Sequence, residues 1–163
     1  AAGSSFGISK AKKKEDLKDA IELALEHDNT VLIEQFIDGT EVSCGIFTHE
    51  EIEVFPLTEI VSHNDFFDFE AKYKGLSDEI TPARISREET ENVQKITKEV
   101  YQKLGLKGIV RIDYIIMKTK PYLIEINTIP GLSRESIIPK QAKQAGYELS
   151  ELFELTIENT LNK

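Results

Sequence analysis

The sequence predicts an α+β fold, with helices packed on antiparallel strands. Helical periodicity and strand-like composition occupy separate segments of the 163-residue chain. Neighbouring strand-like segments are joined by short turns, as antiparallel strands are. No internal repeat, low-complexity tract or linker rich in Pro, Gly or Ser divides the sequence. The length suits either one good core or two small subdomains that share an interface, and we expect one compact unit.

The first predicted elements are one helix and a group of strands. Apolar residues recur over Lys14–His27 with the spacing of a helix that buries one stripe. β-branched and aromatic residues then predict strands at Thr30–Ile37, Glu41–Phe47 and Ile52–Ile60. Asp38-Gly39 supplies a hairpin-type turn between the first two of these strands. An antiparallel meander is the expected result.

A long polar segment separates this group from the next. His63–Pro82 has no clear periodicity, so it predicts a loop of the length that forms lids or binding loops. Helical spacing returns over Arg87–Leu104, and Gly105 is well placed to end that helix. Two further strands follow, and then two helical patterns, Glu135–Ala145 and Ser150–Leu161, which should pack on the sheet.

The two strands after the central helix each carry polar residues on one face. In Ile109–Met117, Arg111 and Asp113 lie two positions apart, and Glu125 and Asn127 do so in the second strand. Side chains two apart on a strand share a face. A hairpin turn between the strands would make three oxygen-bearing side chains converge, with the guanidinium close by. The residues expected on the buried faces are Val110, Ile112, Tyr114, Ile124 and Ile126.

This cluster of oxygen ligands predicts a magnesium site. Carboxylate and amide oxygens are hard ligands that leave room for waters and substrate phosphates. The single cysteine, Cys44, cannot form a thiolate cage, and the three histidines lack the spacing of a zinc motif. The alternative is that these residues are solvated side chains on the outer face of an antiparallel sheet.

Charge and hydropathy limit the class of partner. A net charge of −9 disfavours a nonspecific nucleic-acid binder. No apolar run is long enough to cross a membrane or reads as a secretory signal, and one cysteine is typical of a reducing compartment. We expect a cytoplasmic protein. Since the chain starts without an initiator methionine and its only methionine is Met117, we also expect a fragment of a longer protein.

Two short segments are candidates for nucleotide contacts. The loop Gly3-Ser4-Ser5-Phe6-Gly7 has small residues whose amides can cradle anionic oxygens, although it is not a Walker loop. The end of the strand at Glu34–Ile37 could lie against an adenine, with Glu41 accepting hydrogen bonds from a ribose. The alternatives are a flexible terminus for the first segment and a solvated hairpin for the second.

These segments occur in one order, and together they resemble the D-alanine:D-alanine ligase family of the ATP-grasp superfamily. The most specific of them is the pattern Glu-x-Asn-Thr-x-Pro-Gly followed by Ser-Ile-Ile-Pro, and the match extends over Ala1–Asn162. In chain order the segments are Gly3-Ser4-Ser5, Val31–Phe36, Gly39-Thr40-Glu41, Phe67–Tyr73, Arg111-Ile112-Asp113, Glu125–Gly131 and Ser136–Pro139.

The resemblance implies the ATP-grasp fold, with ATP held between two subdomains. Residues 1–60 would be the remainder of the nucleotide-side subdomain, and residues 61–163 the C-terminal magnesium and substrate subdomain. The family's N-terminal domain would be absent. The implied activity is ATP-dependent formation of D-alanyl-D-alanine for peptidoglycan synthesis. One D-alanine is phosphorylated on its carboxylate, and the amine of a second attacks the D-alanyl phosphate.

The resemblance also implies residue roles at the reacting phosphate. Asp113, Glu125 and Asn127 would hold two Mg²⁺ ions, or Mn²⁺ in their place. Arg111 and the backbone of Gly131 would stabilise the tetrahedral oxyanion, where negative charge develops.

Further roles concern ATP. Ser5 belongs to the phosphate loop, and Lys72 would contact the transferred phosphate. Glu34 and Ile37 would meet the adenine, and Glu41 the ribose.

The second substrate and the closure of the site complete the implied set. Ser136 and the amide of Ile137 would take the carboxylate of the second D-alanine. A hydrogen bond between Ser4 and Tyr73 would link the phosphate loop to the long loop and exclude water. The Lys72-Tyr73 pair resembles the dipeptide-forming branch more than the ligases that make D-alanyl-D-lactate.

Three alternatives stay open from the sequence. The chain could be another ATP-grasp carboxylate–amine ligase, a magnesium–nucleotide module without catalysis, or a structural domain with a solvated acidic face. Small molecules are the expected partners, with no nucleic acid and no membrane. The family implies a homodimeric parent, formed largely through its N-terminal part, and we expect the fragment alone to be inactive.

Overall fold

The computed structural model describes residues 7–62 and 77–161. The chain falls into two compact units, so the expectation of one compact unit is wrong. The first contains Ala1–Ile37 and Ser62–Asp78, and the second contains Asp38–Val61 and Glu79–Lys163. The boundary expected after residue 60 falls inside a strand, and the assignment of a nucleotide side and a substrate side stays a prediction.

In the described part of the first unit, the regular structure before residue 38 is one short helical segment. A turn of 3-10 helix, η1 (Lys14–Asp16), leads into α1 (Leu17–Leu25). This confirms the predicted helix, which ends two residues earlier than expected. No residue of α1 is buried. Its leucines are partly exposed, so packing within this unit contributes little to holding the helix.

The strand predicted at Thr30–Ile37 is wrong, because the segment has no regular structure. Its large apolar side chains face solvent: Leu32 is 80% exposed, Ile33 63% and Phe36 50%. β-branched and aromatic composition favours a strand only where a neighbouring strand supplies hydrogen bonds and a packing surface. No such strand pairs with this segment in the described residues.

The second unit is built on an antiparallel sheet with β1 at its centre. The strand order is β4-β3-β1-β5-β6, and β2 pairs with β1 beside β3. Strand β1 is antiparallel to β2, β3 and β5, and β5 is antiparallel to β6. The strands are β1 (Thr40–Thr48), β2 (Ile52–Val54), β3 (Thr58–Ser62), β4 (Ser77–Ile80), β5 (Val110–Met117) and β6 (Lys120–Asn127).

The topology differs from the predicted meander in two places. The single strand expected at Ile52–Ile60 is split into β2 and β3 by Phe55-Pro56-Leu57, since proline has no amide hydrogen for a ladder. The expected hairpin turn at Asp38-Gly39 is absent. Gly39 instead lies against the carbonyl of Ile116 on the paired strand, where an added Cβ would come within 2.2 Å of the oxygen.

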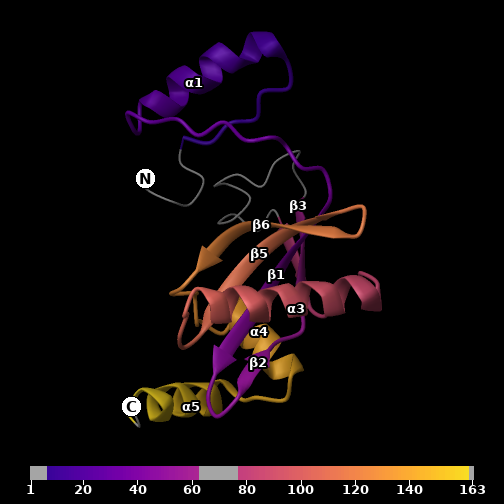
Figure 1. Ribbon diagram of the computed structural model, residues 1–163, viewed down its shortest axis with the longest axis vertical. Helices are drawn as coiled ribbons and strands as arrows, with labels where there is room; N and C mark the ends of the chain where they lie inside the picture. The colour runs from indigo at the N-terminus through magenta and orange to yellow at the C-terminus, as the bar shows by residue number, and fades with distance from the viewer. Residues whose placement is uncertain (1–6, 63–76, 162–163) are drawn as a thin grey trace. The chain divides into compact units, whose positions relative to one another are not determined.

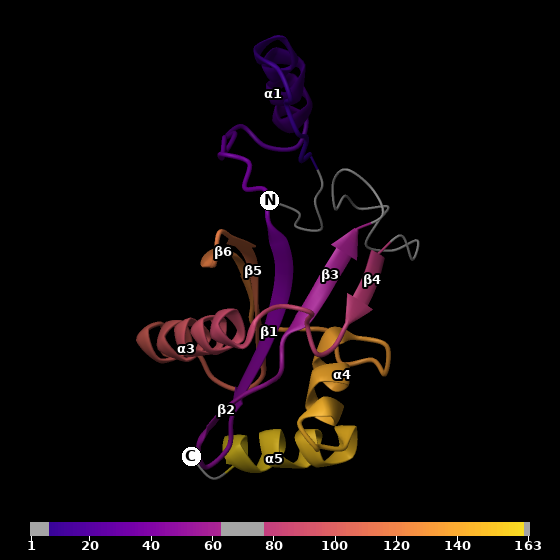
Figure 2. The same ribbon diagram turned by 90° about the vertical axis from the view of Figure 1, so that its right-hand side faces the viewer.

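Three helices complete the second unit: α3 (Arg87–Lys103), α4 (Ile137–Gln144) and α5 (Leu149–Leu161). All three were predicted, with boundaries within two residues. Figure 1 shows α3 lying across the strands, and Figure 2 shows α3 and α4 on opposite faces of the sheet. α3 begins with a capping box, in which the Ser86 Oγ accepts from the Glu89 amide and the Glu89 carboxylate accepts from the Ser86 amide.

Alternation along the strands divides the core between the two faces of the sheet. The larger apolar cluster lies on the face toward α3. Its buried members include Val42, Cys44, Ile46, Val93, Tyr101, Val110, Ile112 and Tyr114. The second cluster lies on the α4 side: Phe47, Phe55, Ile109, Ile138, Ala142 and Leu152. On β1, Ser43, Gly45 and Phe47 alternate with the residues of the larger cluster, so these three residues face α4.

Candidate functional site

The hairpin of β5 and β6 is confirmed, and it places the predicted polar residues side by side. Arg111 is the direct cross-strand partner of Asn127, and Asp113 that of Glu125. Lys118 and its neighbour in the turn have positive φ angles of 50° and 67°, as two-residue hairpin turns of the primed type require. All four polar side chains lie on the face of the sheet opposite α3.

Arg111 and Asp113 form a forked ion pair at the centre of this group. Arg111 Nε lies 2.9 Å from Asp113 Oδ1, and Nη2 lies 2.8 Å from Oδ2. The same Nη2 reaches Glu125 Oε1 at 3.5 Å. Asp113 is buried, whereas the Glu125 side chain is 53% exposed. The site therefore places a buried carboxylate beside an exposed one, and the Arg111 guanidinium bonds to both.

The electrostatics keep the guanidinium charged. Burial alone would lower the pKa of Arg111, but its hydrogen bonds to Asp113 and the charges of Asp113, Glu125 and Glu79 raise the pKa above its ordinary value. A charged donor therefore stays in place at this position at any physiological pH.

Sequence reasoning missed Ser43, which contacts Asp113 from β1. Ser43 is the cross-strand partner of Asp113 on one side and of Thr58 on the other. Its Oγ donates to Asp113 Oδ1 at 2.6 Å, the short distance typical of a hydroxyl on a carboxylate. Glu125, Asp113, Ser43 and Thr58 thus form one line across four strands, which we call the polar row. The sequence signal for this contact was a serine placed between the buried residues Val42 and Cys44.

A buried glutamine from α4 contacts the polar row. Gln141 is fully buried, and its Nε2 donates to the Ser43 carbonyl at 2.8 Å and to Thr58 Oγ1 at 3.0 Å. Gln141 Oε1 has no hydrogen-bond partner among the described residues. Gly45 makes room for it, since a Cβ there would come within 2.5 Å of Oε1. Helix α4 is therefore tied to the sheet directly beside the Asp113 site.

The segment after β6 brings together the other residues predicted near the reacting groups. Asn127 Oδ1 accepts from the amide of Ile129 at 3.1 Å, which shapes the start of the segment. Gly131 lies against Ser136, because an added Cβ would come within 2.8 Å of Ser136 Oγ. Ser136 Oγ lies 2.8 Å from Ser133 Oγ and makes no bond to the first amides of α4, which begins at Ile137.

One predicted burial is wrong. Ile124, expected to face the core, is 50% exposed. Asp113 pairs with Glu125 but Tyr114 pairs with Leu123, so Ile124 is the extra residue of a β-bulge. A bulge breaks the two-residue alternation. Ile126, beyond the bulge, packs against the apolar core as expected.

The remaining predicted residues are not brought into this group by the described contacts. Glu34 is exposed and Ile37 half-buried in the first unit, whereas Glu41 lies on β1 in the second. Ser4, Ser5, Lys72 and Tyr73 lie outside the described residues. The roles of all the site residues stay predictions.

The donor set fits a magnesium ion that arrives with a nucleotide. Within residues 7–62 and 77–161, no group of three or more His, Cys, Asp or Glu side chains is placed to hold a metal. Asp113, Glu125 and Asn127 offer two carboxylates and an amide, and magnesium commonly takes one or two carboxylates and completes its shell with phosphates and waters. Cys44 offers no thiolate, because burial raises the pKa of its thiol to about 12.

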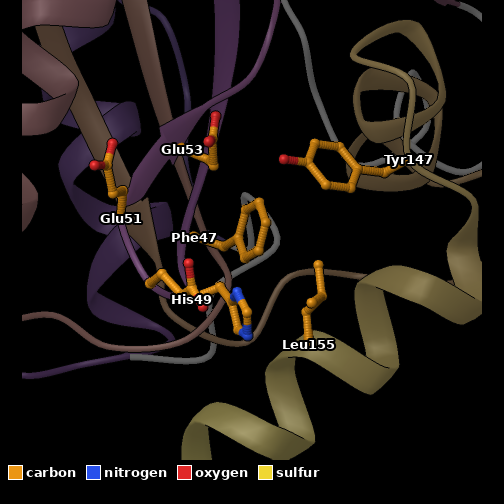
Figure 3. Close-up of a pocket in the computed structure, with 7 residues that line it drawn as sticks. Phe47, His49, Glu51, Glu53, Tyr147 and Leu155 are labelled. Carbon is orange, nitrogen blue, oxygen red and sulfur yellow. The ribbon is translucent and has the colours of Figure 1, made fainter.

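A separate pocket lies toward the other end of β1 (Figure 3). It has a volume of about 270 Å³, and the Phe47 ring and the Tyr147 hydroxyl point into it. Its rim carries three glutamates, whose charge would repel a polyphosphate. The lining residues are Phe47, His49, Glu50, Glu51, Glu53, Tyr147 and Leu155. The lining of this pocket therefore does not suit an anionic nucleotide.

Comparison with known proteins identifies relatives over nearly the whole chain. A family model described as D-ala D-ala ligase C-terminus matches residues 1–158. The D-alanine–D-alanine ligase of Flavobacterium johnsoniae is 56% identical over 161 residues, which are 98% of this chain and 50% of the relative. That of Bacteroides fragilis is 49% identical over 159 residues, 96% of this chain and 49% of the relative. The chain spans about half the length of the curated relatives it matches.

Solved structures give the same result. The VanG D-Ala:D-Ser ligase from Enterococcus faecalis has a TM-score of 0.85 at 37% identity, covering 96% of this chain and 46% of that one. A D-alanine–D-alanine ligase from Bacillus anthracis complexed with ATP has a TM-score of 0.76 at 30% identity, covering 92% and 47%. These likenesses confirm the predicted α+β fold class and the family resemblance. Among the described helices, none has the length and apolar character needed to cross a membrane.

Proposed function

Because this chain belongs to the family of D-alanine–D-alanine ligase C-terminal domains, we propose that it supplies the metal- and substrate-binding half of an ATP-dependent ligase. The ligase joins two D-alanine molecules through a D-alanyl phosphate, and the dipeptide serves peptidoglycan synthesis. One observation carries the proposal. Asp113 and Glu125 are direct cross-strand partners on one face of the sheet, with Arg111 bonded to both.

The metal side of the site rests on the polar face of the hairpin. Asp113, Glu125 and Asn127 would hold two Mg²⁺ ions, or Mn²⁺, together with the phosphates of ATP. The ions would offset the negative charge that ATP and the acyl acceptor gather in one place. Since the chain offers only two carboxylates here, the metal is expected to bind with the nucleotide and weakly without it.

Arg111 and Gly131 act on the developing oxyanion in this proposal. The guanidinium is held by Asp113 and stays charged, so no reorganisation is needed when negative charge forms beside it. The exposed Gly131 leaves its backbone open to a substrate. Its neighbour Ser136 is held by Ser133, which fixes the loop around the reacting carbon.

The start of α4 takes the carboxylate of the second amino acid. The amide of Ile137 is one of the free donors that every helix N-terminus presents, and these favour anions. Ser136 occupies the N-cap position, but its hydroxyl makes no bond to the helix. That hydroxyl is therefore able to bond a carboxylate placed at the helix end.

The second amino acid could also be D-serine. The structure with a TM-score of 0.85 belongs to a D-Ala:D-Ser ligase, so the fold itself does not separate the two substrates. The sequence favours D-alanine through Lys72 and Tyr73, which lie outside the described residues.

The remaining assignments concern ATP and the parent protein. Ser5, Lys72, Glu34, Ile37 and Glu41 would bind the nucleotide. The hydrogen bond from Ser4 to Tyr73 would close the site. The parent would be a cytoplasmic homodimer.

The proposal is tested by calorimetric titration of the chain with ATP, with and without Mg²⁺. We expect binding that requires Mg²⁺ and is weakened at least about tenfold by Glu125→Gln, the order of loss expected when a metal ligand or its close partner is removed. Glu88→Gln on α3, which changes charge equally on the opposite face, should leave the affinity unchanged. Equal affinity of Glu125→Gln and the unmodified chain would favour a structural domain with a solvated acidic face.

Catalysis is tested by joining the chain to the N-terminal half of the Flavobacterium johnsoniae relative. The joined protein should make D-alanyl-D-alanine from ATP and D-alanine, and the chain alone should make none. Competing D-serine and D-lactate in the same assay identifies the second substrate. Nucleotide binding without any product in the joined protein would favour a noncatalytic module or another ATP-grasp ligase.

A further inference from the structure

Asp113 is held from two sides. Arg111 donates to both carboxylate oxygens, and Ser43 Oγ donates to Oδ1 at 2.6 Å. Within the described part of the chain, these two side chains are its hydrogen-bond donors. Ser43 is 2% exposed, so water does not compete for its hydroxyl.

Arg111 and Ser43 differ in how many groups they bind in the proposed reaction. Arg111 is shared between several partners, because its Nη2 donates to Asp113 Oδ2, reaches Glu125 Oε1 at 3.5 Å and would also donate to the oxyanion. Ser43 sits on the central strand, and its hydroxyl donates to Asp113 Oδ1.

We propose that Ser43 is a positioning residue that fixes the orientation of the Asp113 carboxylate for the metal–nucleotide complex. The inference rests on the proposed function, because it assumes that Asp113 is a metal ligand. The bond from Ser43 anchors Oδ1 to the central strand, while Oδ2 accepts from Arg111 alone among the described residues. Partners of metal ligands commonly change metal affinity by about 10–100-fold when they are removed.

The hydroxyl of Ser43 is itself held in place. The backbone of Ser43 pairs with β5 on one side and β3 on the other. Gln141 Nε2 donates to its carbonyl at 2.8 Å, and Gln141 is fully buried. Because Gln141 belongs to α4, the helix that begins at the proposed carboxylate site is anchored to the residue that orients Asp113.

The test measures Mn²⁺ binding in the presence of ATP by electron paramagnetic resonance of free Mn²⁺, on the chain as it is. Ser43→Ala should raise the Mn²⁺ concentration for half-saturation about tenfold. Ser43→Cys, which keeps the volume but is a weak donor, should behave like Ser43→Ala. Ser43→Thr keeps the hydroxyl and should stay within about twofold of the unmodified chain.

A matched control removes another buried hydroxyl bond. Thr97 and Tyr114 share a hydroxyl–hydroxyl bond of 2.9 Å on the α3 face. Thr97→Val should leave Mn²⁺ half-saturation unchanged, although it costs stability. Urea unfolding of each variant shows that the compared chains are folded.

The outcomes separate the two proposals. Asp113-dependent Mn²⁺ binding that is weakened in Ser43→Ala and Ser43→Cys but kept in Ser43→Thr supports the positioning role. Unchanged binding in Ser43→Ala, or equal weakening in Thr97→Val, overturns it and leaves the proposed function intact. If the unmodified chain shows no Mn²⁺ binding that depends on Asp113, the proposed metal site fails and the role of Ser43 fails with it.

Discussion

The two faces of the central sheet are made by the same strands, yet they have different chemistry. On β5, Ile112 and Tyr114 point into the apolar cluster beneath α3, and both are fully buried. Between them, Asp113 points to the other face, where Ser43 and Arg111 bind it. Alternation along a strand therefore assigns stability to one face and ligand chemistry to the other.

The difference shows how a small unit can hold a charged site without losing its core. The apolar face supplies contiguous packing, and each large side chain buried there contributes about 2 kcal/mol. The polar face contains a buried carboxylate, which would be costly if it were unpaired. Its partners come from β1 and β5, so the charge is satisfied before any ligand arrives. Substitutions on one face can therefore be compared with substitutions on the other.

The largest effect is expected on the apolar face. Ile112→Ala removes a fully buried side chain and should lower the free energy of unfolding by about 3 kcal/mol. Leu123→Ala, at a side chain that is 43% exposed, should change it by less than about 0.5 kcal/mol. Urea unfolding measures both. Truncations of this kind in a packed core cost about 2–5 kcal/mol, so a loss below about 1 kcal/mol for Ile112→Ala would contradict this division of the core.

On the polar face, close packing around Gln141 predicts a smaller loss. Gly45→Ala would place a Cβ within 2.6 Å of Ile138 Cδ1 and 2.5 Å of Gln141 Oε1, and should cost about 2 kcal/mol. Combining it with Gln141→Ala should recover part of that cost, because the shorter side chain removes one of the clashes. Strictly additive losses in the double variant would show that Gly45 and Gln141 do not share this space.

The two helices that cover these faces begin with serines used in different ways. Ser86→Ala removes the cap of α3 and should cost about 1 kcal/mol. Ser136→Ala removes no bond to α4 and should cost less than about 0.5 kcal/mol. Thermal unfolding compares the two directly. Equal losses would mean that the Ser136 hydroxyl caps α4 in solution, which would weaken its assignment to a substrate.

The smallest effect concerns an ion pair at the edge of the α3 face. Arg84 Nε lies 2.9 Å from Glu59 Oε2, and hydrogen bonding to Arg84 holds the pKa of Glu59 below its ordinary value. Because the folded pKa is depressed, this stabilisation is present above the unfolded value of about 4.3 and is lost as pH falls through the folded pKa. Arg84→Gln should cost up to about 1 kcal/mol at neutral pH, since Arg84 is largely exposed.

Unfolding of Arg84→Gln and the unmodified chain as a function of pH checks this sign. The difference in the free energy of unfolding between the two proteins should become smaller below a pH of about 4. A difference that grows as the solution becomes acidic would contradict it.

The sequence predicted the parts of the fold that depend on residues close together in the chain. The alternation of Arg111 and Asp113 with buried residues, and the turn at Lys118, define the β5–β6 hairpin within one stretch of chain. The α3 helix was predicted equally well from its apolar spacing and from Gly105, whose positive φ of 61° follows the end of the helix. These features need no information from distant residues.

The errors depend on partners that are distant in sequence. Ser43 contacts Asp113 across 70 residues, and Gln141 contacts Ser43 across 98, so no local pattern reveals either bond. The bulge at Ile124 follows from pairing with β5. The segment at Thr30–Ile37 has strand composition, but no strand pairs with it in the described residues. Pairing, not composition, decides these positions.

The most direct test of the central claim locates the metal on the sheet. Amide signals of the isotope-labelled chain are recorded by nuclear magnetic resonance while Mn²⁺ is added in the presence of ATP, because the ion broadens nearby signals first. We expect the amide signals of Asp113, Glu125 and Asn127 to broaden at the lowest Mn²⁺ concentrations, while that of Thr97 on α3 stays sharp. First broadening at Glu50, Glu51 and Glu53, around the separate pocket, would contradict a metal site on the polar face.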